Sequence, residues 1–171
     1  MATGRDTKLT GATGEFLVAA ELCRRGLMAT PFAGNVPHYD IIASGQRGGH
    51  LAIQVKAING STWQFNVRNF MKVEFDGKRQ VPGAALREPY PNLQVVLVAL
   101  ENDSRQHDRY FVMSWLELRA IATKKYRRYL RKHDGIRPRA PGSFHTAVAE
   151  AEVEDFEDRW EDLFEALRTD V

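Results

Sequence analysis

The chain has 171 residues, of which 43% are hydrophobic and 27% charged, with 24 basic against 22 acidic side chains. This length suits one domain with a sizeable core, and this composition excludes disordered, collagen-like and disulfide-framed proteins. The near-neutral balance hides a division, because residues 150–171 hold ten acidic and two basic side chains and leave a net charge of +10 on the rest.

The first predicted element is a helix over residues 11–25. Apolar side chains recur there with helical period, at Phe16, Ala19 or Ala20, Cys23 and Leu27. This pattern places Cys23, the only cysteine, on the buried face of the helix, which favours a packing role over that of a catalytic thiol. Glu15 lies on a small-residue edge that we expect to face inward.

Strand patterns follow in two groups. The first group covers residues 27–32, 39–44, 51–58 and 62–67, and the second covers 93–100 and 109–113. The apolar run at 93–100 is typical of a strand buried on both faces. Trp63 and Phe65 alternate with polar residues, which favours a core-facing pair over a platform for stacking nucleic-acid bases. Residues 71–91 show no clear pattern.

The last third of the sequence is predicted to be helical. Ser114 caps a helix that reaches His133. Its inner stripe is formed by Trp115, Leu118, Ala122, Tyr126 and Tyr129. A proline-rich connector leads to a last helix, whose apolar stripe is formed by Val153, Phe156, Trp160, Leu163 and Leu167. This order of elements predicts an α/β sandwich around one mixed sheet.

A candidate site comes from the second and third predicted strands, which a glycine-rich turn separates. If that turn is centred near Arg47, position i pairs with about position 94 − i. Asp40 then lies opposite Gln54, and His38 lies opposite Lys56. A register shifted by one residue would instead place Asp40 on the opposite face of the sheet.

Carboxylate and amide oxygens are the ligands that suit a hard divalent cation, Mg²⁺ or its substitute Mn²⁺. Asp40 and Gln54, with Glu15 overhanging from the first helix, therefore form a candidate metal site. Lys56 would project beside the metal, where its ammonium stabilises charge on a phosphate or orients an attacking water. His38 is interpreted either as a group that tunes Lys56 or as an ordinary surface histidine.

These residues resemble motifs of the PD-(D/E)XK, or restriction-endonuclease-like, nuclease superfamily. The sequence is especially similar to small members that look like archaeal Holliday-junction resolvases. The matching segments are Gly-Ala-Thr-Gly-Glu at 11–15, Pro-His-Tyr-Asp at 37–40 and Gln-Val-Lys at 54–56. The resemblance covers roughly the first third of the chain.

The resemblance implies an α/β fold with a restriction-endonuclease-like core, in which a mixed β-sheet made in the order helix, three strands, helix, strand is flanked by helices. It implies a single domain, with the core at 1–113 and C-terminal helices at 114–171 packed on it. It also implies that Glu15, Asp40 and Gln54 are catalytic metal ligands and that Lys56 assists hydrolysis of a DNA phosphodiester.

Gln54 stands where this family most often has Asp or Glu. Its amide oxygen can coordinate a metal but adds no negative charge. Two interpretations stay open: a Mg²⁺-dependent DNA endonuclease, or a catalytically inactive nuclease-fold module that binds nucleic acid or a protein partner, with Asp40 and Lys56 as a structural ion pair.

Basic side chains on the predicted helix after Ser114 supply a candidate nucleic-acid surface. They lie on one solvent face, at Lys124, Arg127, Arg128 and Arg131. Such a face either tracks DNA phosphates or is a solvated face paired with the acidic C-terminal segment.

The expected surroundings follow from what the sequence lacks. No stretch is long and apolar enough to cross a bilayer, and the N-terminus shows no apolar signal segment. We therefore expect a cytoplasmic protein without a membrane partner. A homodimer is a further expectation, because cutting both strands of DNA requires two active sites.

Overall fold

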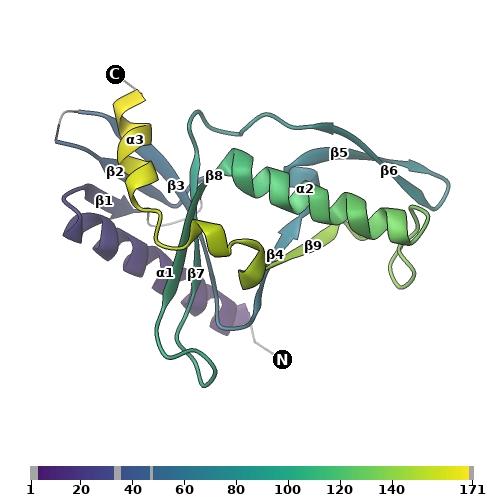
Figure 1. The fold of residues 1–171 in the computed structure, drawn as a ribbon, viewed down its shortest axis with the longest axis horizontal. Coiled ribbons are helices and arrows are strands. Elements are labelled where there is room, and N and C mark those ends of the chain that lie inside the picture. The colour runs from purple at the N-terminus through teal and green to yellow at the C-terminus, as the bar shows by residue number, and fades with distance from the viewer. Residues whose placement is uncertain (1–3, 33–35, 47, 170–171) are drawn as a thin grey trace.

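A computed structural model describes residues 4–32, 36–46 and 48–169 of the chain (Figure 1). Helix α1 (Gly4–Arg24) precedes strands β1 (Met28–Pro31), β2 (Ile41–Ser44) and β3 (His50–Ile58). Next come β4 (Thr62–Asn66), the 3-10 turn η1 (Val67–Asn69) and the hairpin of β5 (Met71–Asp76) and β6 (Arg79–Ala85). The chain continues through β7 (Gln94–Ala99), β8 (Arg109–Ser114), α2 (Trp115–Lys132), β9 (His145–Ala149), the 3-10 turns η2 (Glu150–Glu152) and η3 (Glu154–Phe156), and α3 (Glu161–Thr169).

The centre of the fold is a five-stranded mixed sheet in the order β1-β2-β3-β7-β8. Strands β3 and β7 are parallel, and the other neighbours are antiparallel. Every residue of β7 is buried, with Val96 and Val98 facing one apolar core and Val95 and Leu97 facing the other. The predicted mixed sheet and its doubly buried strand are confirmed.

Different elements cover the two faces of the sheet. Helices α1 and α3 pack on one face, through Leu22 and Leu163 among other side chains. Helix α2 and the two-stranded β4–β9 sheet pack on the other face, through Leu118, Trp63 and Val148. Figure 1 shows that α2 and the β5–β6 hairpin extend side by side away from the central sheet.

The connection between the parallel strands β3 and β7 differs from the expected helix. Residues 59–93 are all described and contain no α-helix; they form β4, η1 and the β5–β6 hairpin. Pro82 and Gly83 within β6 are poor helix formers, which accounts for this outcome. Trp63 and Phe65 are buried, so the predicted core-facing pair is confirmed.

Helix α1 begins earlier than predicted and presents a different face to the core. Phe16 is 68% exposed and Cys23 is also exposed, so the predicted burial of Cys23 is wrong. The buried row is formed instead by Gly14, Val18 and Leu22, which recur at intervals of four residues. The inner face of α1 is therefore rotated away from the predicted one.

The C-terminal third is only partly as predicted. Helix α2 is confirmed, and Ser114 with Glu117 forms a capping box at its start, but Leu130 is buried where Tyr129 was expected. The predicted long last helix is broken into η2, η3 and the short α3, because the chain turns at Asp158, whose φ is +52°. The proline-rich connector leads into β9. None of the helices, as far as the chain is described, combines the length and apolar character needed to span a membrane.

Candidate functional site

The register of the β2–β3 hairpin brings Asp40 to Gln54. Ile41 pairs with Ile53, so position i pairs with position 94 − i, and one further residue places Asp40 opposite Gln54. The backbone N–H of Asp40 donates to the Ile53 carbonyl at 2.9 Å. The predicted register is confirmed and the register shifted by one residue is wrong; Arg47, the predicted centre of the turn, lies outside the described residues.

The Asp40 carboxylate is held in place by the neighbouring strand. The backbone N–H of Val55 donates to its Oδ2 at 2.7 Å. Burial raises the pKa of Asp40, while the Val55 N–H and the positive charge of Lys56 oppose that rise. Among the described residues none donates a hydrogen bond to Oδ1, which leaves this oxygen available to a cation.

Glu15 approaches Asp40 because α1 packs very closely on β3. Gly14 has no side chain, and a Cβ at this position would lie 2.5 Å from the Cβ of Ala57. This close contact holds the next residue, Glu15, near β3 and within the electrostatic reach of Asp40. Burial and the negative charge of Asp40 raise the pKa of Glu15, so the two carboxylates repel each other when both are ionised.

Gln54 and Lys56 share the face of β3 that looks toward α2, because they alternate with the buried Ile53 and Val55. Both line a cleft of about 370 Å³. Its other lining residues include three aromatic side chains, Phe65, Phe70 and Trp115. They also include three polar or charged side chains, His38, Asn69 and Arg87. The Lys56 Nζ lies 5.7 Å from the centre of the Phe65 ring, which holds the ammonium at the cleft wall.

The four predicted residues therefore form two neighbouring pairs. Glu15 and Asp40 form an acidic pair, Gln54 and Lys56 form a cleft wall, and the charge interaction between Asp40 and Lys56 connects the two. The donors offered to a cation are oxygens, which suits Mg²⁺ or Mn²⁺. In the described part of the chain no three His, Cys, Asp or Glu side chains cluster as metal ligands, so a cation here would rely on two carboxylates and the Gln54 amide.

The predicted basic surface of α2 is exposed at all four positions, but it is divided into two sides. On one side, Lys125 forms an ion pair with Glu152, and Arg128 lies 3.9 Å from the same carboxylate; Lys124 and Arg128 line a small pocket there. On the other side, Arg127 donates to the Gly83 carbonyl at 2.7 Å. Part of the surface is thus paired with the acidic segment, as one interpretation expected, and part is not.

Sequence reasoning missed Arg87 and Asn69, which line the cleft with Lys56. Both belong to the segment that returns from β3 to β7, where no periodic pattern indicated their position. Arg87 lies on the stretch after β6, and Asn69 lies at the end of η1. The signal for both is tertiary, since the chain segments before and after the β5–β6 hairpin meet at the cleft that contains Lys56.

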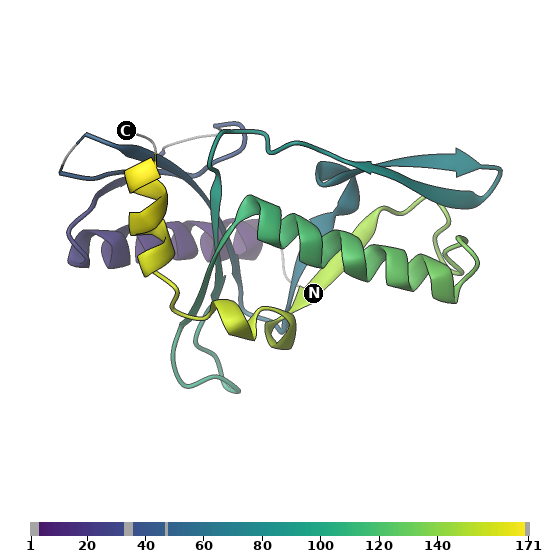
Figure 2. The same ribbon diagram turned by 45° about the horizontal axis from the view of Figure 1, so that its top comes forward.

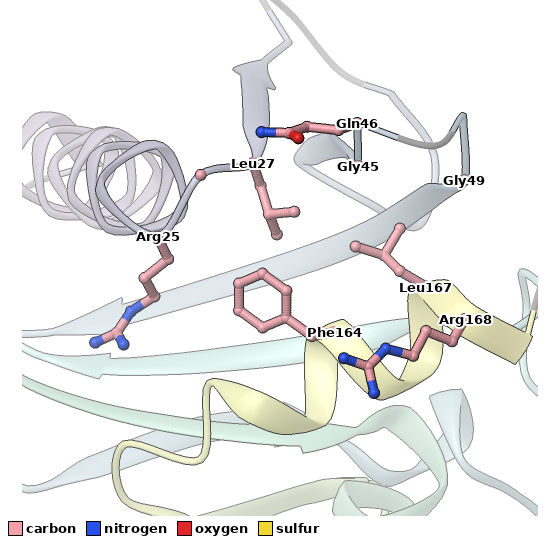
Figure 3. A pocket seen from close by; sticks show the side chains of 9 residues that line it. Arg25, Leu27, Gly45, Gln46, Gly49, Phe164, Leu167 and Arg168 are labelled. Carbon is pink, nitrogen blue, oxygen red and sulfur yellow. The ribbon is translucent and has the colours of Figure 1, made fainter.

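A larger cleft, of about 640 Å³, lies on the other face of the sheet (Figure 3). It lies between the end of α1, the β2–β3 turn and α3, and Phe164 and Leu167 supply much of its apolar wall. Arg25 and Arg168 also line it. Its described lining residues include none of the predicted site residues and no carboxylate.

Comparison with known proteins gives a likeness in fold. No protein-family model matches the sequence, and a search of curated protein sequences finds no match. The structure is similar to that of a bacterial homing endonuclease, I-Ssp6803I, with a TM-score of 0.51, 12% sequence identity and 93% of each chain covered. At this identity the likeness concerns the fold, which is therefore nuclease-like.

Proposed function

We propose that this protein is a DNA endonuclease that hydrolyses phosphodiester bonds with the help of Mg²⁺ or Mn²⁺. The observation that carries the proposal is the hairpin register, which sets Asp40 opposite Gln54 with Lys56 on the same strand and in the same cleft as Gln54. The fold shared with a homing endonuclease supports the same reaction class. DNA is accordingly the proposed partner.

Each residue has a distinct role in this proposal. Glu15, Asp40 and Gln54 hold the cation through their oxygens, and the Val55 N–H keeps the Asp40 carboxylate oriented. The bound cation supplies charge stabilisation for the phosphate. Lys56 contributes a second positive charge at the cleft wall, where it binds a phosphate oxygen and stabilises charge that develops during cleavage.

The raised pKa values of Glu15 and Asp40 fit a cation site. Two partly buried carboxylates that repel each other are stabilised when a divalent cation binds between them. Metal binding should therefore release protons at pH values where either carboxyl is still partly protonated.

A plasmid-nicking assay with Mg²⁺ or Mn²⁺ tests the proposal. We expect cleavage by the native protein, and at least a hundredfold loss with Asp40→Asn or Lys56→Met while thermal unfolding stays cooperative. Lys8→Met, which changes an exposed lysine near the start of α1, is the matched control and should cleave normally. Equal activity in all variants, or no cleavage of linear, nicked, branched or single-stranded DNA, would overturn the proposal.

Gln54 supports one competing function, a nuclease-fold module that binds nucleic acid without cutting it. The neutral amide leaves the site with one negative charge fewer than a third carboxylate would give. Gln54→Glu should bind Mg²⁺ more tightly in calorimetry under either function, which tests whether residue 54 contacts the cation. The two functions are separated by cleavage of DNA by the native protein, which is expected only if it is an enzyme. Sedimentation analysis of the same samples tests the expected homodimer.

A further inference from the structure

A basic groove lies at the far end of α2 from the candidate site. It has a volume of about 700 Å³ and lies between β6 and the last turns of α2. Arg79 enters it from β6, and Arg127 and Arg131 enter it from α2. Asp134 is the only acidic residue among its described lining residues. The groove therefore collects three guanidinium groups from two separate elements.

Backbone contacts hold two of these arginines without cancelling their charge. The Nε of Arg79 donates to the Asp134 carbonyl at 2.8 Å, and the Nη2 of Arg127 donates to the Gly83 carbonyl at 2.7 Å. No ion pair among the described residues includes Arg79, Arg127 or Arg131. This distinguishes the groove from the Lys125 and Arg128 side of α2, where Glu152 offsets the positive charge.

The same two elements connect the groove to the candidate site. Trp115 at the start of α2 and Arg87 beyond β6 both line the cleft that contains Lys56. From Trp115 to Leu130 the axis of α2 advances about 22 Å, at about 1.5 Å per residue. The extended chain from Arg79 to Arg87 covers about 26 Å, at about 3.3 Å per residue. Figure 2 shows the β5–β6 hairpin running alongside α2.

We propose that the groove binds the sugar-phosphate backbone of duplex DNA whose cleaved phosphate lies in the Lys56 cleft; this rests on the proposed endonuclease function. Phosphates of one strand advance about 3.4 Å along the duplex axis per nucleotide, so about 22 to 26 Å along that axis corresponds to about six to eight base pairs. The substrate is then a duplex that continues for at least this length on one side of the cleaved bond. Guanidinium groups suit this role because their fork of donors matches phosphate oxygens.

A binding experiment with matched charge changes tests the groove. In the Asp40→Asn background, without divalent metal, the triple variant Arg79→Gln/Arg127→Gln/Arg131→Gln is compared with a control, Lys8→Gln/Arg24→Gln/Arg168→Gln. The three control residues are exposed and lie on α1 and α3, which cover the other face of the central sheet. Both remove three positive charges, so any effect of net charge alone is equal. Fluorescence anisotropy gives the affinity for duplexes of increasing length at several salt concentrations.

We expect the groove variant to lose affinity for long duplexes and to show a salt dependence less steep by about two to three phosphate contacts. Between about 50 and 200 mM salt, the factor by which its affinity falls should then be roughly 12 to 40 times smaller than the factor for the parent. The control variant should stay close to the parent, and duplexes shorter than about six base pairs should not distinguish the groove variant. Equal losses in both triple variants, or an unchanged salt slope in the groove variant, would overturn the proposal.

The outcome separates the groove from the endonuclease function. If the native protein cuts DNA with metal but the groove variant binds DNA like the control, the groove proposal is wrong and the proposed function stands. If the groove variant loses binding while the native protein never cuts DNA, the proposed function is wrong and the groove is a DNA-binding surface only. Circular dichroism melts confirm that each variant is folded.

Discussion

A methyl group added at Gly14 tests how closely α1 must approach β3. The added Cβ would lie 2.5 Å from the Cβ and 3.6 Å from the Cα of Ala57. Both atoms belong to, or are bonded directly to, the backbone of β3, so no side-chain rotation relieves the contact. Gly14→Ala must therefore push the helix and the strand apart, and Glu15 with them.

The size of the effect follows from two opposing contributions. Alanine stabilises a helix interior by about 1 kcal/mol relative to glycine. Overpacking a close contact costs about 1 to 3 kcal/mol. Gly11→Ala, in the same helix with nothing within 4 Å of its Cβ, gains the first contribution without the second. We therefore expect the free energy of unfolding of Gly14→Ala to lie about 1 to 3 kcal/mol below that of Gly11→Ala.

Urea unfolding followed by circular dichroism measures this difference, and an unchanged m-value shows that both variants unfold in the same way. Adding Ala57→Gly to Gly14→Ala removes the clashing methyl group, so the double-mutant cycle should show a favourable coupling of about 1 to 2 kcal/mol. Metal affinity should fall in Gly14→Ala and recover with Ala57→Gly. Equal stability of the two alanine variants would refute the close-packing argument.

Three further predictions concern charge and exposure. Burial raises the pKa of Glu15 and Asp40, so without metal the contribution of these two carboxyls to the free energy of unfolding is fully present below their ordinary pKa values of about 4 and is lost as pH rises through the raised values. In urea titrations with EDTA, Glu15→Gln and Asp40→Asn should each lose less stability than the native protein as pH rises through this range, and an unchanged pH dependence would contradict the prediction. Cys23 is exposed, so a thiol reagent should label the native protein fully, and a need for denaturant would show the thiol to be buried. Arg109 donates hydrogen bonds to both carboxylate oxygens of Glu157 at 2.7 Å. Arg109→Met should therefore lower the free energy of unfolding by about 1 to 2 kcal/mol, and this loss should be smaller in high salt. A loss that does not change with salt would point to packing instead.

The parts of the fold that the sequence predicted well are those fixed by local pattern. Alternating polar and apolar residues on β3, together with a glycine-rich turn, were enough to predict that Asp40 lies opposite Gln54. The apolar run of β7 predicted a strand buried on both faces, because only such a strand tolerates apolar residues at every position. Ser114 predicted the start of α2 in the same local way.

The parts that failed depend on contacts between distant segments. Helix α1 carries small or apolar residues on two sides, and the choice between Phe16 and Leu22 as the inner side follows from the fit of Gly14 to Ala57. Arg87 reaches the cleft through a crossover whose path has no periodic signature. Strand β9 is five residues long, and its partner β4 lies far away in the sequence.

The pairing of β4 with β9 also bears on when the candidate site is completed during synthesis. Phe65 lines the cleft beside Lys56, and its strand partner is Thr146. On a ribosome the central strands emerge before β9, so the cleft wall that includes Phe65 lacks its neighbouring strand until residues 145–149 have been translated. A nascent chain that already exposes Asp40 and Lys56 therefore gains its finished cleft only after β9 has been made.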